Sequence, residues 1–156
     1  RTVDFKNTVV IMTSNIGSAD LIDNMNDDGS IDEEVENAVT DKLKAYFRPE
    51  FLNRIDDIIL FNPLTKVQVM DIIRLSLKGL QNRLADRDIT LEMTDAAVAY
   101  IADEAYDPHY GARPIKRYLQ KNIETSIASM IIRGDIMDGQ KIVCDVEDGS
   151  LVYNAL

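Results

Sequence analysis

Gly111-Ala112-Arg113-Pro114 opens the most informative segment of the sequence, because an amphipathic pattern follows it. Proline is favoured at the first position of a helix, so Pro114 predicts a helix start and places Arg113 at the helix N-terminus. The helix dipole there favours anions, and an arginine suits the position only if an anion such as a polyphosphate binds beside it. The alternative interpretation is a loop arginine held by Asp107 or by solvent.

Two upstream segments also place polar residues next to apolar runs. Thr8-Val9-Val10-Ile11-Met12-Thr13-Ser14-Asn15 predicts a strand buried on both faces, as in a parallel sheet. Ligands of such sheets bind at the carboxyl ends of strands, where Asn15 would lie, although an asparagine there is also a common turn residue. Phe51-Leu52-Asn53-Arg54-Ile55-Asp56 sets Arg54 among apolar residues, with an ion pair to Asp56 or Asp57 as the simpler explanation.

Taken in order, Thr13-Ser14-Asn15, the segment 51–56 and Gly111-Ala112-Arg113-Pro114 resemble the Clp/Hsp100 branch of the AAA+ ATPases. Within that branch they look like the C-terminal half of the second nucleotide-binding domain of the disaggregases, and the resemblance covers nearly the whole chain. It implies that Asn15 is sensor 1, which positions the attacking water, and that Arg54 is the arginine finger, which reaches the ATP of a neighbouring subunit. It further implies that Arg113 is sensor 2, which contacts the nucleotide from the lid together with Ala112.

The resemblance also implies a fold with two parts. Residues 1–61 would be an α/β remnant of an AAA+ large subdomain, and residues 62–156 an α+β small (lid) subdomain of three helices and a small sheet. Asn62-Pro63-Leu64 breaks the chain and marks the predicted boundary.

Local patterns predict the individual elements. In the first part, a capping box at Ser30–Glu33 begins a helix that runs to Phe47, and residues 58–61 form a strand. In the second part, the patterns predict a helix after the capping box Thr65–Gln68, a strand at 89–93, a helix from Thr94 or Asp95 to Glu104, a helix from Pro114 to Gly134, and strands at 141–146 and 151–153 joined by an Asp148-Gly149 hairpin.

Two parts of an ATPase site are missing from the sequence. There is no G-x-x-x-x-G-K-[ST] loop and no apolar strand ending in the paired acidic residues that hold magnesium. In the resembled family both precede the three motifs, so we expect a fragment that does not turn over ATP alone. ATP or ADP with Mg²⁺ would be the cofactor of the parent protein, and the isolated chain is expected to bind neither tightly.

The implied function is that of an ATP-driven hexameric ring, in the cytoplasm or an organelle matrix, that threads aggregated or unfolded proteins with a DnaK-type chaperone system. The closest alternative is a Clp-type unfoldase that feeds a ClpP-like protease. Such unfoldases carry an Ile/Leu-Gly-Phe/Leu tripeptide between sensor 1 and the finger, whereas Ile16-Gly17 here is followed by Ser18. A non-catalytic oligomerisation module is the third reading, and the joint presence of Asn15, Arg54 and Arg113 speaks against it.

Composition narrows the remaining classes. The net charge of −10 argues against a general nucleic-acid surface. One cysteine excludes an internal disulfide framework, and Cys144 lies in an alternating strand pattern that indicates a structural thiol. No membrane helix or signal peptide is visible.

The segment 23–29 predicts a solvated acidic loop, because the residue spacing of a calcium loop is not satisfied. The lone His109 indicates a loop-orienting residue rather than a general base, and it gives zinc no support.

Overall fold

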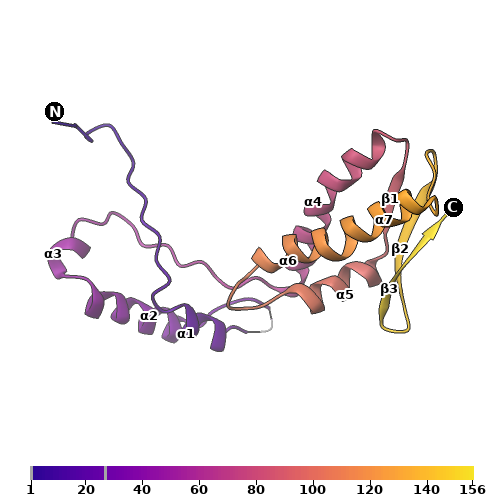
Figure 1. The fold of residues 1–156 in the computed structure, drawn as a ribbon. Coiled ribbons are helices and arrows are strands. Elements are labelled where there is room, and N and C mark those ends of the chain that lie inside the picture. Colours follow the sequence, from indigo (N-terminus) through magenta and orange to yellow (C-terminus); the bar gives the residue numbers. More distant parts are fainter. Residues whose placement is uncertain (1, 27) are drawn as a thin grey trace.

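The computed structural model describes residues 2–26 and 28–156, so Arg1 and Asp27 of the predicted acidic loop lie outside the described residues. Figure 1 shows two lobes joined by an extended segment. The first lobe holds α1 (Ser18–Asp23), α2 (Glu33–Tyr46) and α3 (Pro49–Leu52). The second lobe holds all the remaining helices and strands, and it contains most of the buried apolar side chains.

In the first lobe, α1 packs on α2 through the buried side chains of Leu21 and Val39. Gly17, which precedes α1, has a φ of 78°, and a Cβ added there would lie 2.7 Å from a methyl carbon of Val39. Only glycine satisfies both the backbone conformation and this close approach. Helix α2 begins with three acidic residues in its first turn, which suits the helix dipole.

The predicted capping box at Ser30–Glu33 is wrong. The N-cap of α2 is Asp32, and its side chain accepts no capping hydrogen bond from the helix. The hydroxyl of Ser30 instead accepts a hydrogen bond from Nδ2 of Asn26 at 3.0 Å, and a backbone bridge joins Met25 to Ile31. Short polar side chains bond to whichever nearby group is free, and here the turn before the helix competes successfully for the serine.

The two strands predicted in the first lobe are also not formed. Residues 8–12 and 58–61 are extended, but they pair with no strand among the described residues. Their side chains are strongly exposed: Val9 by 88%, Val10 by 81% and Ile59 by 69%. A strand is stabilised by ladder hydrogen bonds and by side chains on its neighbours, so an apolar run without neighbours stays extended and unpaired.

The helices of the second lobe begin and end as local signals predict. In the capping box of α4 (Lys66–Ala85), Gln68 N–H donates to Oγ1 of Thr65 at 3.3 Å and Thr65 N–H donates to Oε1 of Gln68 at 2.9 Å. Thr94 caps α5 (Asp95–Ala105) by accepting from the N–H of Ala97. The chain after Gly111 forms one continuous helical run made of α6 (Arg113–Tyr118), the π-helix η1 (Leu119–Glu124) and α7 (Thr125–Arg133).

That helical run ends at Gly134, whose φ is 82°. The N–H of Asp135 donates to the carbonyl of Met130, and the N–H of Gly134 donates to that of Ile131. This is the Schellman arrangement, in which a left-handed glycine satisfies the last carbonyls of a helix. The predicted helix end at Gly134 is therefore confirmed.

The sheet of the second lobe has the order β1-β2-β3, with β1 (Thr90–Met93) parallel to β2 (Lys141–Glu147) and β2 antiparallel to β3 (Ser150–Ala155). The β2–β3 turn places Asp148 and Gly149 at φ 49° and 71°. Two successive positive φ values are the signature of a type I′ hairpin turn, as the Asp-Gly pair predicts. The predicted α+β lid with a small sheet is confirmed.

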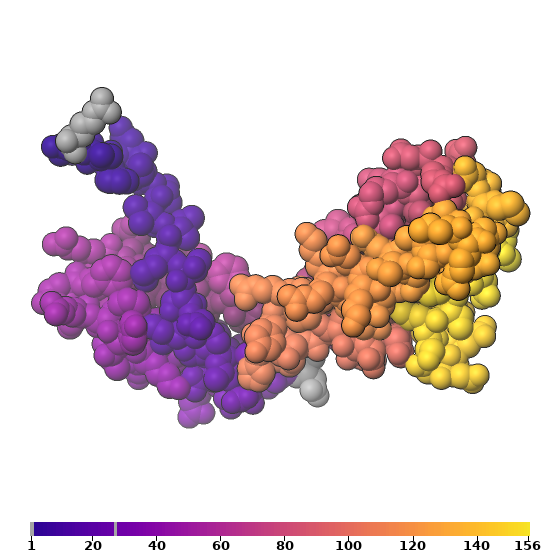
Figure 2. Space-filling view, viewed as in Figure 1, coloured from indigo at the N-terminus to yellow at the C-terminus, as the bar shows by residue number. Residues whose placement is uncertain are grey.

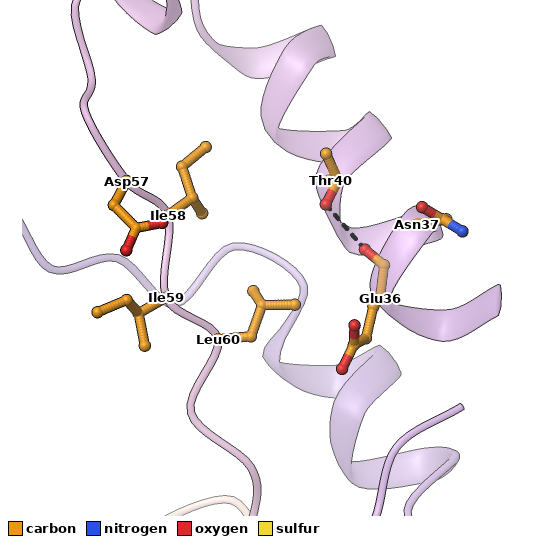
Figure 3. A pocket seen from close by; sticks show the side chains of 7 residues that line it. All are labelled: Glu36, Asn37, Thr40, Asp57, Ile58, Ile59 and Leu60. Atoms are coloured by element: carbon orange, nitrogen blue, oxygen red, sulfur yellow. Dashed lines mark hydrogen bonds between the residues drawn. The ribbon is translucent and has the colours of Figure 1, made fainter. Parts of the chain in front are cut away.

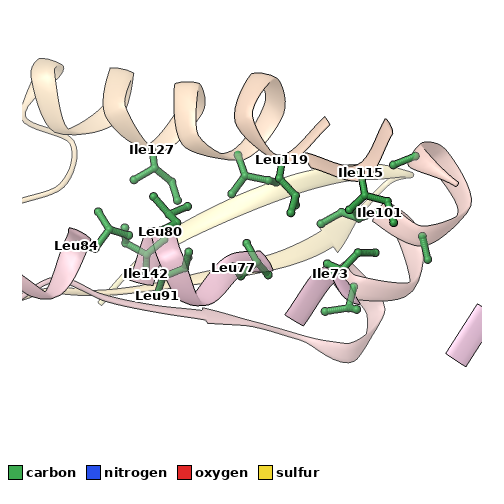
Figure 4. Packing of buried hydrophobic residues seen from close by; sticks show 14 of the residues in the cluster. Ile73, Leu77, Leu80, Leu84, Leu91, Ile101, Ile115, Leu119, Ile127 and Ile142 are labelled. Atoms are coloured by element: carbon green, nitrogen blue, oxygen red, sulfur yellow. The ribbon is translucent and has the colours of Figure 1, made fainter. Parts of the chain in front are cut away.

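The core lies where the helices meet the sheet (Figure 4). The fully buried side chains there are mainly isoleucines: Ile73, Ile89, Ile101, Ile115, Ile123, Ile127, Ile136 and Ile142. Cys144 is also buried, and burial raises the pKa of its thiol to about 12, so it acts as a small apolar residue of the strand. None of the described helices has the length and apolar content needed to span a membrane.

Amide exchange is expected to separate the two lobes. The apolar cluster of the second lobe protects the backbone hydrogen bonds of α4 and α5, whereas residues 8–15 and 56–62 make no ladder hydrogen bonds. We expect exchange in α4 to be slower than in 8–15 by about 10³-fold or more, as for a stably folded core against an open segment. Hydrogen–deuterium exchange of the 156-residue chain, read by mass spectrometry, measures this directly. Equal protection of both regions would contradict the described packing.

Candidate functional site

Arg113 stands at the end of a tightly closed loop between α5 and α6. Oδ1 of Asp107 accepts the backbone N–H of His109 at 2.8 Å, and the carbonyl of Asp107 accepts the N–H of Gly111 at 2.7 Å. Gly111 has a φ of 61°, which glycine adopts without strain. An aspartate that bonds the backbone two residues on forms an Asx turn, so Asp107 closes the loop just before Arg113.

Asp107 therefore does not hold Arg113 in place. Its carboxylate is directed at backbone amides, and the side chain of Arg113 is exposed and has no ion pair within the described part of the chain. His109 is likewise exposed, and the bond that orients it comes from its backbone N–H. The loop-orienting role predicted for His109 thus falls mainly on Asp107.

The helix that follows is basic where its dipole is positive. Arg113 is the first helical residue and Pro114 the second, one position away from the predicted start. The first two turns contain Arg113, Lys116 and Arg117 and no acidic residue. Positive side chains at a helix N-terminus are unfavourable by themselves, and an anion bound there would relieve that repulsion. The arrangement is suited to phosphate oxygens, which a guanidinium can grip in pairs.

A hydrogen bond links this loop to the segment between the lobes. The hydroxyl of Tyr106 donates to the carbonyl of Leu64 at 2.9 Å, across 42 positions of sequence. Burial raises the pKa of Tyr106, and the negative charge of Asp107 adds to the effect, so the hydroxyl remains a donor. Sequence reasoning missed this bond, because nothing in the local pattern of either residue identifies its partner.

Asn15 and Arg54 lie in the first lobe, each beside a short helix. The carbonyl of Asn15 accepts hydrogen bonds from the backbone N–H and the hydroxyl of Ser18, which fix the backbone before α1. The side chain of Asn15 is exposed and takes no part in these bonds. Arg54 follows α3, with its N–H bonded to the carbonyl of Phe51. Its side chain is exposed and forms no ion pair with Asp56 or Asp57, both of which are described residues.

The three predicted residues do not form a closed site. Asn15 and Arg54 belong to the first lobe and Arg113 to the second, and Figure 2 shows the lobes as two masses joined below and separated above. No hydrogen bond or ion pair joins their side chains in the described part of the chain. The structure thus shows three outward-facing groups that could act on a ligand bound largely by other residues.

Two surface depressions lie elsewhere. One, of about 440 Å³, lies between α2 and residues 57–60 and is lined by Glu36, Asn37, Thr40, Asp57, Ile58, Ile59 and Leu60 (Figure 3). The other, of about 210 Å³, lies beside η1 and includes Tyr118, Asn122 and Tyr153. Neither is lined by a predicted site residue. Residues 2–26 and 28–156 also hold no group of three or more side chains placed to ligate a metal.

The fold of the second lobe is that of an AAA+ small, or lid, subdomain. The family described as the "C-terminal, D2-small domain, of ClpB protein" matches residues 64–144, and the family described as "AAA domain (Cdc48 subfamily)" matches residues 1–58. The chain belongs to the ClpB D2-small family, and a segment of an AAA domain precedes the D2-small domain within it. The predicted resemblance to the C-terminal half of the second ClpB nucleotide-binding domain is confirmed.

Individual relatives agree along nearly the whole chain. It is 55% identical over 154 residues to the chaperone protein ClpB of Bacillus cereus (strain ATCC 14579), and 52% identical over 156 residues to that of Clostridium tetani. It is 51% identical over 154 residues to ClpB 1 of Thermosynechococcus vestitus. These alignments include 98% to 100% of this chain, which spans 18% of the length of each relative.

Proposed function

We propose that this chain supplies three residues to ATP hydrolysis in a ring-forming chaperone that unfolds and threads aggregated proteins. Asn15 would serve as sensor 1, Arg54 as the arginine finger, and Arg113, with Ala112 beside it, as sensor 2. The observation that carries the proposal is Arg113 itself, an exposed arginine without an ion pair among the described residues, at the first position of a basic helix end. Family membership supplies the class of ligand, a nucleotide.

The chemistry of these groups fits a nucleotide phosphate. A bound ATP with Mg²⁺ would supply the phosphoryl group and the metal, and ADP would remain as the product. The phosphate cradle would come from residues outside this sequence, which has no G-x-x-x-x-G-K-[ST] loop. Arg54 and Arg113 would bind phosphate oxygens through planar guanidinium groups. The side-chain amide of Asn15 would orient a water molecule. Phosphoryl transfer depends mainly on such positioning and charge stabilisation.

We assign residues 1–61 to the large subdomain and residues 62–156 to the lid, with Asn62-Pro63-Leu64 as the hinge between them. The apolar cluster of the second lobe supports this division, because Leu64 packs against it and no residue before Leu64 does so among those described. Movement of the lid would then carry Arg113 relative to Asn15 and Arg54. The position of Arg113 relative to Asn15 and Arg54 would therefore depend on which nucleotide is bound.

The proposed partners follow from the relatives, whose printed name is chaperone protein ClpB. We propose a homohexameric ring that acts on aggregated or unfolded proteins together with a DnaK-type chaperone system in the cytoplasm. The Ile16-Gly17-Ser18 sequence favours this function over that of an unfoldase that feeds a protease.

Recovery of a heat-aggregated reporter enzyme tests the proposal. The full-length protein that contains this chain would be incubated with ATP and a DnaK-type system, as wild type, Arg113→Ala and Arg133→Ala. Arg133 is an exposed arginine at the opposite end of the same helical run, so it controls for loss of charge. We expect recovery with wild type and Arg133→Ala and its loss with Arg113→Ala. Degradation of the reporter after addition of a ClpP-type peptidase, with no recovery, would instead establish a proteolytic unfoldase.

A further inference from the structure

We propose that Tyr106 is a positioning residue that ties the loop bearing Arg113 to the hinge between the two lobes. The inference rests on the proposed function, because it assigns Tyr106 a role through sensor 2. Tyr106 itself would touch neither nucleotide nor substrate. Its contribution would be to make the direction of Arg113 depend on the position of the hinge.

The bond is placed where such a connection is needed. Leu64, whose carbonyl accepts from the Tyr106 hydroxyl at 2.9 Å, follows Asn62-Pro63 directly and precedes Thr65, the N-cap of α4. Tyr106 is the C-cap residue that follows α5, and its own N–H donates to the carbonyl of Ala102 at 3.1 Å. The side chain therefore joins the first residues of the second lobe to the start of the loop.

The loop between this bond and Arg113 is held by packing at both ends and by hydrogen bonds within it. Leu64 of the hinge packs against the apolar cluster of the second lobe. Tyr106 and Ala112, at the two ends of the loop, pack against the same cluster. Between Tyr106 and Ala112, the Asp107 turn closes the loop onto itself through Gly111. Arg113 then starts the helix, so a shift of Leu64 can reach the backbone of Arg113 through this hydrogen-bonded loop.

The hydroxyl and the ring have separable tasks. The ring is half-buried against the cluster and would stabilise the lobe whether the residue is tyrosine or phenylalanine, whereas the hydrogen bond to Leu64 comes from the hydroxyl. Tyr106→Phe therefore removes the connection and keeps the packing. A net hydrogen bond corresponds to about a 2- to 10-fold change in an equilibrium, which sets the expected size of the effect.

A matched control exists in the same lobe. The hydroxyl of Tyr153 also donates to a backbone carbonyl at 2.9 Å, that of Asn122 in the π-helix, and both tyrosines are partly buried. Tyr153→Phe removes the same kind of bond away from the loop and the hinge. The Asn122 carbonyl also accepts the Ser126 hydroxyl, so it keeps one donor in this variant. Any general effect of losing a tyrosine hydroxyl from the lobe would appear in both variants.

The first test uses amide exchange of the 156-residue chain and needs no nucleotide. Tyr106→Phe is expected to speed exchange of the Tyr110 and Gly111 amides, which both donate to the Asp107 carbonyl, by about 2- to 10-fold, whereas Tyr153→Phe leaves them unchanged. Unchanged exchange in Tyr106→Phe would overturn the inference, because the hydroxyl would then not hold the loop.

The second test measures steady-state ATP hydrolysis by the full-length protein. Tyr106→Phe is expected to lower kcat/KM for ATP by about 2- to 10-fold, whereas Tyr153→Phe is expected to keep the wild-type value. In an Arg113→Ala background, Tyr106→Phe is expected to cause no further decrease. An equal effect of Tyr106→Phe with and without Arg113 would overturn the inference and leave sensor 2 in place. An Arg113→Ala variant with wild-type kinetics would overturn the proposed function, whatever the exchange data show.

Discussion

Replacing Arg54 with alanine is expected to lower ATP turnover by the assembled full-length protein by about 10³- to 10⁵-fold, the range seen for arginine fingers supplied to phosphoryl transfer. Arg54 lies just after α3, exposed, with no ion pair to the neighbouring aspartates. A guanidinium presented outward from a short helix is suited to act on a phosphate of another subunit. Steady-state hydrolysis measured with saturating ATP gives the change in kcat.

The control and the binding experiment separate a finger from a structural arginine. Arg48 is the exposed N-cap residue of the same helix, and Arg48→Ala should leave turnover within about 2-fold of wild type, as for a surface substitution. Because the finger would act on a neighbour's nucleotide, Arg54→Ala should still bind a fluorescent ADP analogue with nearly wild-type affinity. Arg54→Lys should fail as well, since an ammonium cannot grip two phosphate oxygens. Turnover by Arg54→Ala within tenfold of wild type would refute the assignment.

The lid could be predicted from its sequence because its signals are local. The reciprocal hydrogen bonds of Thr65 and Gln68, the left-handed Gly134 and the Asp148-Gly149 turn all join residues a few positions apart. Such signals act within a turn of chain, so the sequence contains both partners. The apolar stripe of α4 then lies in the core, with Ile73, Leu77 and Leu84 buried as its spacing predicts.

The first lobe was predicted less well because its signals depend on distant partners. The apolar run at 8–12 has the composition of a buried strand, but burial and pairing come from neighbouring strands that the described residues do not provide. Ser30 failed as a cap for a related reason, since Asn26 offered a competing partner. Propensity therefore predicts the extended conformation of these runs, whereas strand pairing requires neighbouring strands.

Two features near the site had no sequence signal. The Tyr106–Leu64 bond spans 42 positions, and a tyrosine hydroxyl can bond to any carbonyl in reach. The π-helix η1 leaves the stripe of buried Leu119 and Ile123 nearly unchanged, so helical periodicity does not reveal it. Side chains satisfy its displaced carbonyls: Ser126 and Tyr153 both donate to that of Asn122. The sequence motifs identify the candidate ligand-binding residues, whereas the contacts that position those residues join distant parts of the chain and have no local sequence signal.

Replacing Ile127 with alanine is expected to reduce the free energy of unfolding of the lid by about 2–5 kcal/mol, whereas Ile132→Ala should change it by no more than about 0.5 kcal/mol. Both isoleucines lie on α7, but Ile127 is 1% exposed and Ile132 is 85% exposed. Ile127 belongs to the same buried cluster as Leu80 and Leu84, which lie near it in the view of Figure 4, so its truncation leaves a cavity in that core.

The comparison isolates that cavity. The two substitutions are chemically identical, neither changes the charge, and both gain the same small helix propensity on going from isoleucine to alanine. Urea denaturation of the 156-residue chain, followed by circular dichroism, gives the midpoint and slope for each variant. Because small domains are stable by only about 5–15 kcal/mol, Ile127→Ala should unfold at a clearly lower urea concentration. Equal midpoints for the two variants would mean that α7 does not pack into the buried cluster, and the support proposed for the Arg113 helix would fail with it.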